Sequence, residues 1–414
     1  MQHLAAAAGP SAPPLRTGDD VAAQVAAALE LGPPGRTDAE LEWFVHDALD
    51  PLATPPLDRV RTALAGAALP AAGRLRWAPG GQLGLRSVRQ AGPVATVAAL
   101  REDLTAVQGA LAAAGLVLRG GGADPVRRPV RLLRTPYEDS LASYFALDGP
   151  AAARAARTLL CSTAAVRVGV DAGLPGEGAT SAAGRWERAH ALGPALVAAF
   201  ACSPVLLATR TGWRSCRREA WDCLEPARTR PPRPGLGPVE ATTEQALAAR
   251  VLALRAPDGT CRPAPPLTLA DWLAGALDAP PTPADVERHL GTLFPPVGVR
   301  RGYQLRYLDG LPDPLWEVAV AVATVLLDDE RAADEARAAC EPVEGRWSAA
   351  ARVAVRDPGL ARAALGCLQA AEAALSRAGA DELAAAVGAY AERFPARSRC
   401  PADDVLDGLV DLPV

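Results

Sequence analysis

Alternation of apolar and polar residues predicts several short strands. In residues 38–46 the odd-numbered positions are apolar and most even-numbered ones are polar. This is the period of a strand with one buried face. Further strands, each bounded by Gly, Pro or Asp, are predicted at residues 75–78, 82–88, 115–119, 162–171 and 303–309.

Apolar residues at helical spacing predict long helices between and after these strands. A helix over residues 18–31 ends at the Gly-Pro-Pro-Gly of residues 32–35. Because strands and helices do not alternate strictly, we expect an α+β fold, a sheet with helices on one side. The other long helices are predicted at residues 94–114, 186–201, 314–327 and 358–378, all rich in Ala and Leu.

The amino-acid composition limits the kinds of molecule that the chain is expected to bind. The 414 residues are 50% hydrophobic but only 4% aromatic, which predicts a large core of helices packed through small side chains. The net charge of -4 is spread without blocks, so we expect small-molecule partners, with no nucleic acid and no membrane. The apolar residues 191–209 are interrupted by Gly193 and Pro204, which predicts a buried helix followed by a turn.

All 43 basic residues are arginine. Without lysine the chain can have neither a Walker A phosphate loop nor Schiff-base chemistry. The eight cysteines form no C-x-x-C pair and are expected to be small buried hydrophobes. The N-terminus lacks the pattern of a secretory signal, so the predicted compartment is the cytoplasm.

Four segments carry the candidate chemistry: residues 38–45, 78–83, 162–173 and 289–309, the last containing Arg300-Arg301. In the first, the period of a strand places Glu40 and Glu42 on one face. Two carboxylates on one face suit a hard cation, and a solvated strand edge is the alternative.

Taken in this order, the segments resemble the glutamate-cysteine ligase family that makes γ-glutamylcysteine for ergothioneine biosynthesis. The resemblance implies a glutamine-synthetase-like fold, an antiparallel sheet forming a cradle with helices packed on its outer side. It implies that ATP and Mg²⁺ are bound, with Glu40 and Glu42 as metal ligands. It further implies that the γ-carboxylate of glutamate is phosphorylated and that the amine of cysteine attacks the acyl phosphate.

Several positions depart from the family pattern. The family carries acidic residues where this chain has Ala78, Gly84 and Gln304. It carries Ser where this chain has Arg86, and Gln and Asn where this chain has Arg167 and Gly169. We therefore predict that Arg86 or Arg167 neutralises Glu40 or Glu42 in place of a metal ion.

Guanidinium groups suit carboxylate and phosphate, so Arg217, Arg301 and Arg306 are the predicted substrate contacts, with structural salt bridges as the alternative. Three functions stay open: a working ligase acting on glutamate, cysteine and ATP, a catalytically impaired homologue that binds ligands or associates with another subunit, and a metal-independent acyl transferase. The predicted divisions are an N-terminal segment and helix (1–35), a ligase-like domain (36–328) and a helical region (329–414) packed on that domain.

Overall fold

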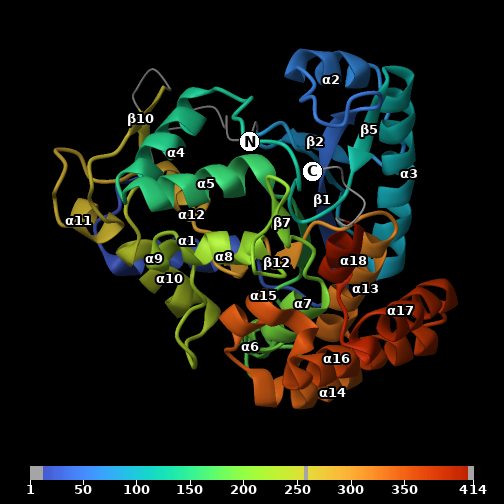
Figure 1. Cartoon of the computed structure of the whole chain (residues 1–414). Coiled ribbons are helices and arrows are strands. Elements are labelled where there is room, and N and C mark those ends of the chain that lie inside the picture. Colours follow the sequence, from blue (N-terminus) through green and yellow to red (C-terminus); the bar gives the residue numbers. More distant parts are fainter. Residues whose placement is uncertain (1–12, 256–259, 409–414) are drawn as a thin grey trace.

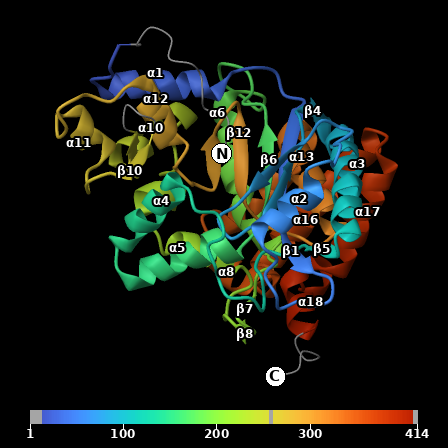
Figure 2. The same cartoon turned by 90° about the horizontal axis from the view of Figure 1, so that it is seen from above.

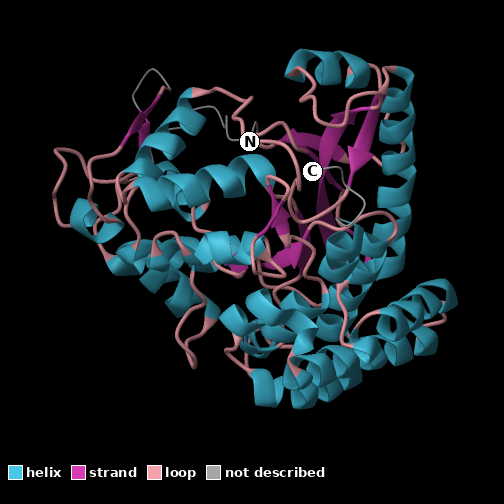
Figure 3. Ribbon diagram, viewed as in Figure 1, coloured by secondary structure: helices cyan, strands magenta, loops and turns pink. Residues whose placement is uncertain are grey.

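The computed structural model describes residues 13–255 and 260–408, and its centre is an antiparallel sheet with the strand order β11-β12-β6-β1-β3-β2 (Figure 1, Figure 3). Two short strands, β4 and β5, pair with the two ends of β1. The strands are β1 (Arg36–Asp47), β2 (Arg74–Trp77), β3 (Leu83–Arg86), β4 (Gln90–Ala91), β5 (Leu116–Arg119), β6 (Ala165–Val170), β11 (Val297–Val299) and β12 (Tyr303–Asp309).

One face of the sheet is buried under helices. The odd-numbered residues of β1 point into the core, where Leu41 and Trp43 lie with Val166 and Val168 of β6. Helices α3 (Gly92–Ala113) and α13 (Leu315–Asp328) cover this face and contact each other. The expected α+β architecture, an antiparallel sheet with helices on its outer side, is confirmed.

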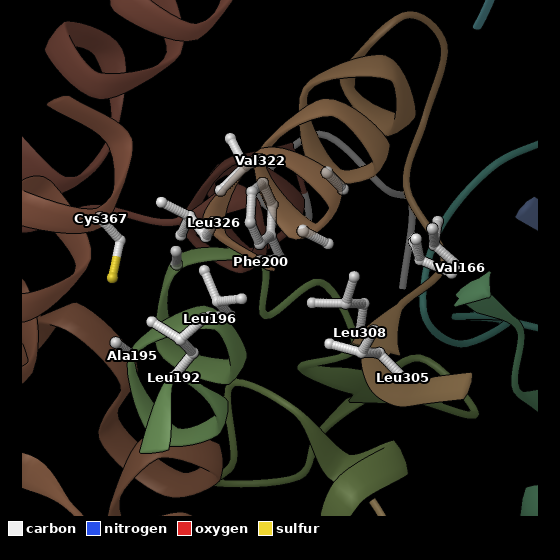
Figure 4. Packing of buried hydrophobic residues seen from close by; sticks show 14 of the residues in the cluster. Val166, Leu192, Ala195, Leu196, Phe200, Leu305, Leu308, Val322, Leu326 and Cys367 are labelled. Carbon is white, nitrogen blue, oxygen red and sulfur yellow. The ribbon is translucent and has the colours of Figure 1, made fainter. Parts of the chain in front are cut away.

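Small side chains let the helices of the core approach closely. All seven residues of α7 (Gly193–Ala199) are buried, and this helix contacts α16 (Pro358–Arg377) and α15 (Trp347–Val353). Leu196, Phe200 and Leu326 meet there (Figure 4). Outside this layer lie α14 (Glu330–Cys340), α17 (Asp381–Arg393) and α18 (Pro401–Gly408). Packing at this density makes the core sensitive to a single added methyl group.

A second group of helices lies on the other side of β12 (Figure 2). Helix α1 (Gly18–Leu29) contacts α10 (Pro238–Ala248) and α12 (Pro283–Leu290) around buried Val21 and Val25. The remaining helices and strands of this side are α4 (Pro136–Ala146), α5 (Pro150–Ser162), α8 (Cys216–Asp222), α9 (Pro226–Thr229), α11 (Leu269–Leu273), β9 (Ala253–Arg255) and β10 (Cys261–Pro263).

All six predicted strands are present, but the helix predicted over residues 186–201 is two helices. Helix α6 (Ala182–Ala191) ends before Leu192, and α7 starts at Gly193. The proline at position 194 has no N–H for the carbonyl one turn earlier, which interrupts the hydrogen-bond ladder. Proline also begins α9, α10 and α12, at the helix position where its missing N–H is not needed. Helix α2 (Leu57–Leu64) and the strands β7 (Val205–Leu206) and β8 (Thr209–Arg210) were not predicted.

The cysteine prediction holds for six of the eight thiols. Cys161, Cys202, Cys216, Cys340, Cys367 and Cys400 are buried, whereas Cys223 is exposed and Cys261 is partly exposed. Cys223 directly follows the short helix α8, and Cys261 lies in the short strand β10, both outside the main core.

Candidate active site

The uncovered face of the sheet, called the cradle face below, carries Asp38, Glu40 and Glu42 of β1. Because directly paired residues in neighbouring strands point to the same side, the register assigns the other members. Glu40 lies opposite Arg86 of β3 and Arg167 of β6, and Glu42 lies opposite Gly84. The remaining members include Arg74, Arg76 and Gly169, with Gln304 and Arg306 of β12, Gly298 of the outer strand β11 and Arg300 directly after it.

Arg167 connects the two glutamates. Its Nη1 donates to Glu40 Oε1 at 3.0 Å and to Glu42 Oε1 at 2.6 Å. The other oxygens are also held: Arg76 Nη1 donates to Glu40 Oε2 at 3.2 Å, and the backbone N–H of Ala165 donates to Glu42 Oε2 at 2.9 Å. Both carboxylates are thus paired within the chain, as the sequence predicted for Arg167.

Arg86 has a different partner from the one predicted. It lies opposite Glu40 in the register, yet its Nη2 donates to Asp38 Oδ1 at 2.8 Å. Asp38 has room for this contact because Gly169 beside it has no side chain: a Cβ there would lie 2.9 Å from Asp38 Oδ2. Arg89 also approaches Asp38, at 3.5 Å, and reaches Asp171 at 3.2 Å.

These ion pairs keep the Glu40 carboxylate ionised. Burial alone would raise the pKa of Glu40, but Arg167, Arg76 and Arg86 outweigh burial, so this pKa is lowered. For Arg167, burial opposes the charge while Glu42 and Glu40 favour it, and its pKa is raised. Each partner therefore fixes the charged form of the other.

The outer strands carry guanidinium groups without matching carboxylates. Arg306 donates from Nε to Gln304 Oε1 at 2.9 Å and from Nη1 to the carbonyl of Leu293 at 2.6 Å. Burial, together with Arg167 and Arg300, lowers the pKa of Arg306 to about 9. The pKa of Arg300, which is exposed yet partly desolvated by neighbouring protein atoms, is lowered by that desolvation and by Arg86 and Arg76. In both cases desolvation is the largest cause, and neighbouring guanidinium groups add to it, so positive charge is gathered on this side of the face.

The residues of the cradle face do not fit a magnesium ion. Magnesium requires oxygen ligands, and both glutamates already hold Arg167. Within residues 13–255 and 260–408, no group of three or more His, Cys, Asp or Glu side chains is arranged to hold a metal. Ala78, Gly84 and Gln304, at positions where the related pattern is acidic, offer no carboxylate.

The three arginines predicted to contact substrate lie in different surroundings. Arg217 is 3% exposed, donates to the carbonyls of Arg306 and Leu308, and lies 3.7 Å from Asp309. Arg301 is 76% exposed and pairs with Glu30 of the α1 end, 3.2 Å away. Arg306 lies on the cradle face. The structure brings Arg306 close to Glu40 and Arg167 and places Arg301 at the solvent-facing end of β12.

Asp309 links β12 to the segment before α8. Its carboxylate accepts hydrogen bonds from the N–H of Cys202 and from the hydroxyls of Ser203 and Ser215. Burial raises its pKa, although Arg217 and these hydrogen bonds lower it. Asp309 therefore ties the end of β12 to the segments at Cys202, Ser203 and Ser215.

The turn at residues 78–82 closes the hairpin of β2 and β3 against α5. Ala78 N–H donates to the carbonyl of Gln82 at 3.0 Å, and Gly81 has φ +83°. A Cβ at Gly80 would lie 2.2 Å from the carbonyl oxygen of Cys161, so only glycine fits there. Gln82 donates to the carbonyl of Thr163 at 2.8 Å, which ties the turn to the start of β6.

Sequence reasoning did not single out Arg76, Asp38 or Arg300 as members of this face. Asp38 shares the parity of Glu40 and Glu42, so alternation alone could have included it. Arg76 lies in a predicted strand, but its contact with Glu40 depends on the pairing of β2 with β3 and of β3 with β1. Arg300 follows a three-residue strand that no pattern marked.

No helix within the part of the chain that the structure describes is both long enough and apolar enough to cross a membrane.

Comparisons with known proteins cover nearly the whole chain. The profile of glutamate-cysteine ligase family 2 (GCS2) matches residues 38–408. A relative from Mycolicibacterium smegmatis named glutamate–cysteine ligase EgtA is 37% identical over 403 residues, which is 95% of this chain and 92% of that protein. The EgtA protein of Mycobacterium tuberculosis H37Rv is 36% identical over 387 residues, 92% of this chain and 87% of that protein.

A solved structure shares the fold. The glutamate–cysteine ligase of Francisella tularensis, in complex with AMP, aligns with a TM-score of 0.52 over 91% of this chain and 85% of that chain. The two sequences are 12% identical, so this likeness concerns architecture alone.

Proposed function

Because the chain belongs to glutamate-cysteine ligase family 2, as the four collinear segments predicted, we propose that it joins L-glutamate to L-cysteine with ATP. The product is γ-glutamylcysteine, and the proposed pathway is ergothioneine biosynthesis, by similarity to the two EgtA relatives. The observation that carries this proposal is 37% identity sustained over 95% of the chain.

The proposed reaction has two steps. The γ-carboxylate oxygen of glutamate takes the terminal phosphoryl group of ATP, which releases ADP and leaves an acyl phosphate. The amine nitrogen of cysteine then attacks the acyl carbon, inorganic phosphate leaves, and the amine loses a proton. Magnesium, where bound, would neutralise the phosphate charge, but the cradle face offers it no free carboxylate pair.

The residues of the chain itself have defined tasks in this proposal. Arg306 and Arg300 provide positive charge close to Glu40 and Arg167, where anionic groups of a substrate would be stabilised. Arg167 holds β1 and β6 at a fixed spacing through Glu40 and Glu42. Arg217 supports β12 by donating to its backbone carbonyls.

A specific observation favours a second function, ligand binding without turnover. Arg167 occupies the space between Glu40 and Glu42, and the acidic positions of the family pattern are Ala78, Gly84 and Gln304. A homologue of this kind would keep the fold and the anion-binding arginines and lose phosphoryl transfer.

One assay distinguishes the two functions. The purified protein is incubated with glutamate, cysteine, ATP and Mg²⁺, and γ-glutamylcysteine and ADP are quantified by chromatography and mass spectrometry. Formation of both in equal amounts, and neither when glutamate is omitted, supports the ligase. Absence of product from a folded protein that still binds ATP or glutamate in calorimetry supports binding without turnover.

A further inference from the structure

The cradle face carries more positive than negative charge among the described residues. Around Glu40 its guanidinium groups are those of Arg76, Arg86, Arg167, Arg300 and Arg306, and its carboxylates are those of Asp38, Glu40 and Glu42. Arg74, which lies opposite Arg86 on the edge strand β2, adds one more guanidinium. Arg89 and Asp171, which form an ion pair with each other, add one charge of each sign, so the excess of positive over negative charge stays the same. Even without Arg74, two positive charges therefore remain without a carboxylate.

The unmatched charges can be assigned to particular side chains. Arg306 bonds to the neutral Gln304 and to a backbone carbonyl, and neither contact cancels its charge. Arg300 is exposed and has no ion-pair partner within residues 13–255 and 260–408, although Arg76 and Arg86 lie close enough to lower its pKa. The surplus is located at β11 and β12.

Three guanidinium groups of the face are reachable from solvent. The side chains of Arg76, Arg86 and Arg167 are 28%, 25% and 24% exposed. Gly84 and Gly298 remove side chains from this face, and a Cβ at Gly298 would lie 2.6 Å from the guanidinium carbon of Arg306. Planar guanidinium groups on an open, glycine-lined face are suited to the oxygens of phosphate.

We propose that the cradle face binds the phosphate groups of its ligand through Arg300, Arg306 and the outer N–H groups of Arg76 and Arg86, without a divalent cation. Arg167, fixed between Glu40 and Glu42, supplies the positive charge at the position where a cation would otherwise bind. The ligand is a phosphoanion with at least two negative charges. This inference rests on the proposed function, because it concerns the site at which that function expects ATP.

Calorimetric titration of the full chain with inorganic pyrophosphate, ADP and ATP, each in EDTA and in excess Mg²⁺, tests the proposal. We expect pyrophosphate to bind in EDTA with an affinity equal to or higher than in Mg²⁺, since magnesium neutralises the anion. Binding should weaken as salt is raised, because the contacts are between exposed charges. If ATP and ADP bind more tightly than pyrophosphate, the ligand is a nucleotide. If all three bind with equal affinity, the site recognises only the phosphate groups.

Three variants localise the contact. Arg300→Gln removes an unpaired guanidinium and should weaken binding in EDTA about tenfold. Gln304→Glu places a carboxylate beside Arg306 and should weaken it by a similar factor without removing any arginine. Arg331→Gln, which changes the same charge on the exposed surface of α14, is the control and should leave binding unchanged.

Pyrophosphate binding that requires Mg²⁺, absence of binding in EDTA, or equal affinities for Arg300→Gln and Arg331→Gln would overturn the proposal. Its failure is distinguishable from that of the ligase function. A protein that forms γ-glutamylcysteine yet binds pyrophosphate only with Mg²⁺ refutes this inference alone. A protein that binds pyrophosphate in EDTA and forms no product refutes the ligase function alone.

Discussion

At the scale of single residues, Arg167 stabilises two neighbouring strands at once. Its guanidinium is held by Glu40 of β1 and Glu42 two residues further along. Replacing it by glutamine leaves two buried carboxylates that repel each other, which costs much more than loss of an exposed pair. We predict that Arg167→Gln lowers the free energy of unfolding by about 3 to 5 kcal/mol, measured by urea denaturation at pH 7.

The matched control for this prediction is Arg331→Gln. Arg331 forms an exposed pair with Glu335 at 2.9 Å, so its loss should change the free energy of unfolding by less than about 0.5 kcal/mol. Coincident denaturation curves for the two variants would show that Arg167 is not an important stabilising contact.

Alternation along β1 predicted that Glu40 and Glu42 share the cradle face, but not every pair that forms on it. Arg167 reaches the predicted carboxylates, whereas Arg86 bonds to Asp38 although Glu40 lies opposite it in the register. Arginine is long enough to reach diagonal neighbours, and Glu40 is already bonded to Arg167 and Arg76. The partner of each arginine thus depends on competition among neighbouring side chains. The alternation of residues along a strand gives no information about that competition.

At the scale of elements, the approach of α7 to α15 depends on a single glycine. A Cβ at Gly193 would lie 1.8 Å from the ring of Trp347. Trp347 is buried and contacts Tyr307 and Arg218, so its ring has little freedom to move. We predict that Gly193→Ala lowers the free energy of unfolding by about 1 to 3 kcal/mol, measured from the urea midpoint.

The same change at Gly109 should act in the opposite direction. Gly109 lies in α3, is exposed, and has no atom near the position of an added Cβ. Alanine has a higher helix propensity than glycine, so Gly109→Ala should raise the free energy of unfolding by about 0.5 to 1 kcal/mol. Equal effects of the two substitutions would contradict the role assigned to the Trp347 contact.

Strands were predicted more completely than helices because the cradle requires alternation. One face of β1 and β6 is apolar and the other is charged, and that difference is visible in the residue order. Helices α4 and α5 escaped prediction because proline and glycine at residues 136, 149 and 150 resemble loop signals. In the folded chain these prolines occupy the first turn of each helix, where the missing N–H is not needed.

At the scale of the whole molecule, the buried His289 and the partly buried His190 link stability to pH. His289 bonds through Nε2 to the carbonyl of Ala246, and His190 bonds through Nδ1 to the carbonyl of Trp186. Burial lowers the pKa of each from the usual value of 6.5 to about 4. The unfolded chain therefore takes up protons at these sites at higher pH than the folded chain does.

It follows that the stabilisation from the neutral histidines is fully present above pH 6.5 and is lost as the pH falls toward 4. Each histidine accounts for about 3 kcal/mol of this loss, and the raised pKa of Asp309 acts in the opposite direction. We therefore predict that the free energy of unfolding falls between pH 7 and pH 4 in both proteins. The fall should be about 3 kcal/mol smaller for His289→Gln than for the unmodified chain. Urea denaturation at a series of pH values measures it, and parallel curves for the two proteins would mean that His289 titrates alike in the folded and unfolded states. Glutamine can keep the bond to the Ala246 carbonyl, so the comparison isolates the proton from the packing.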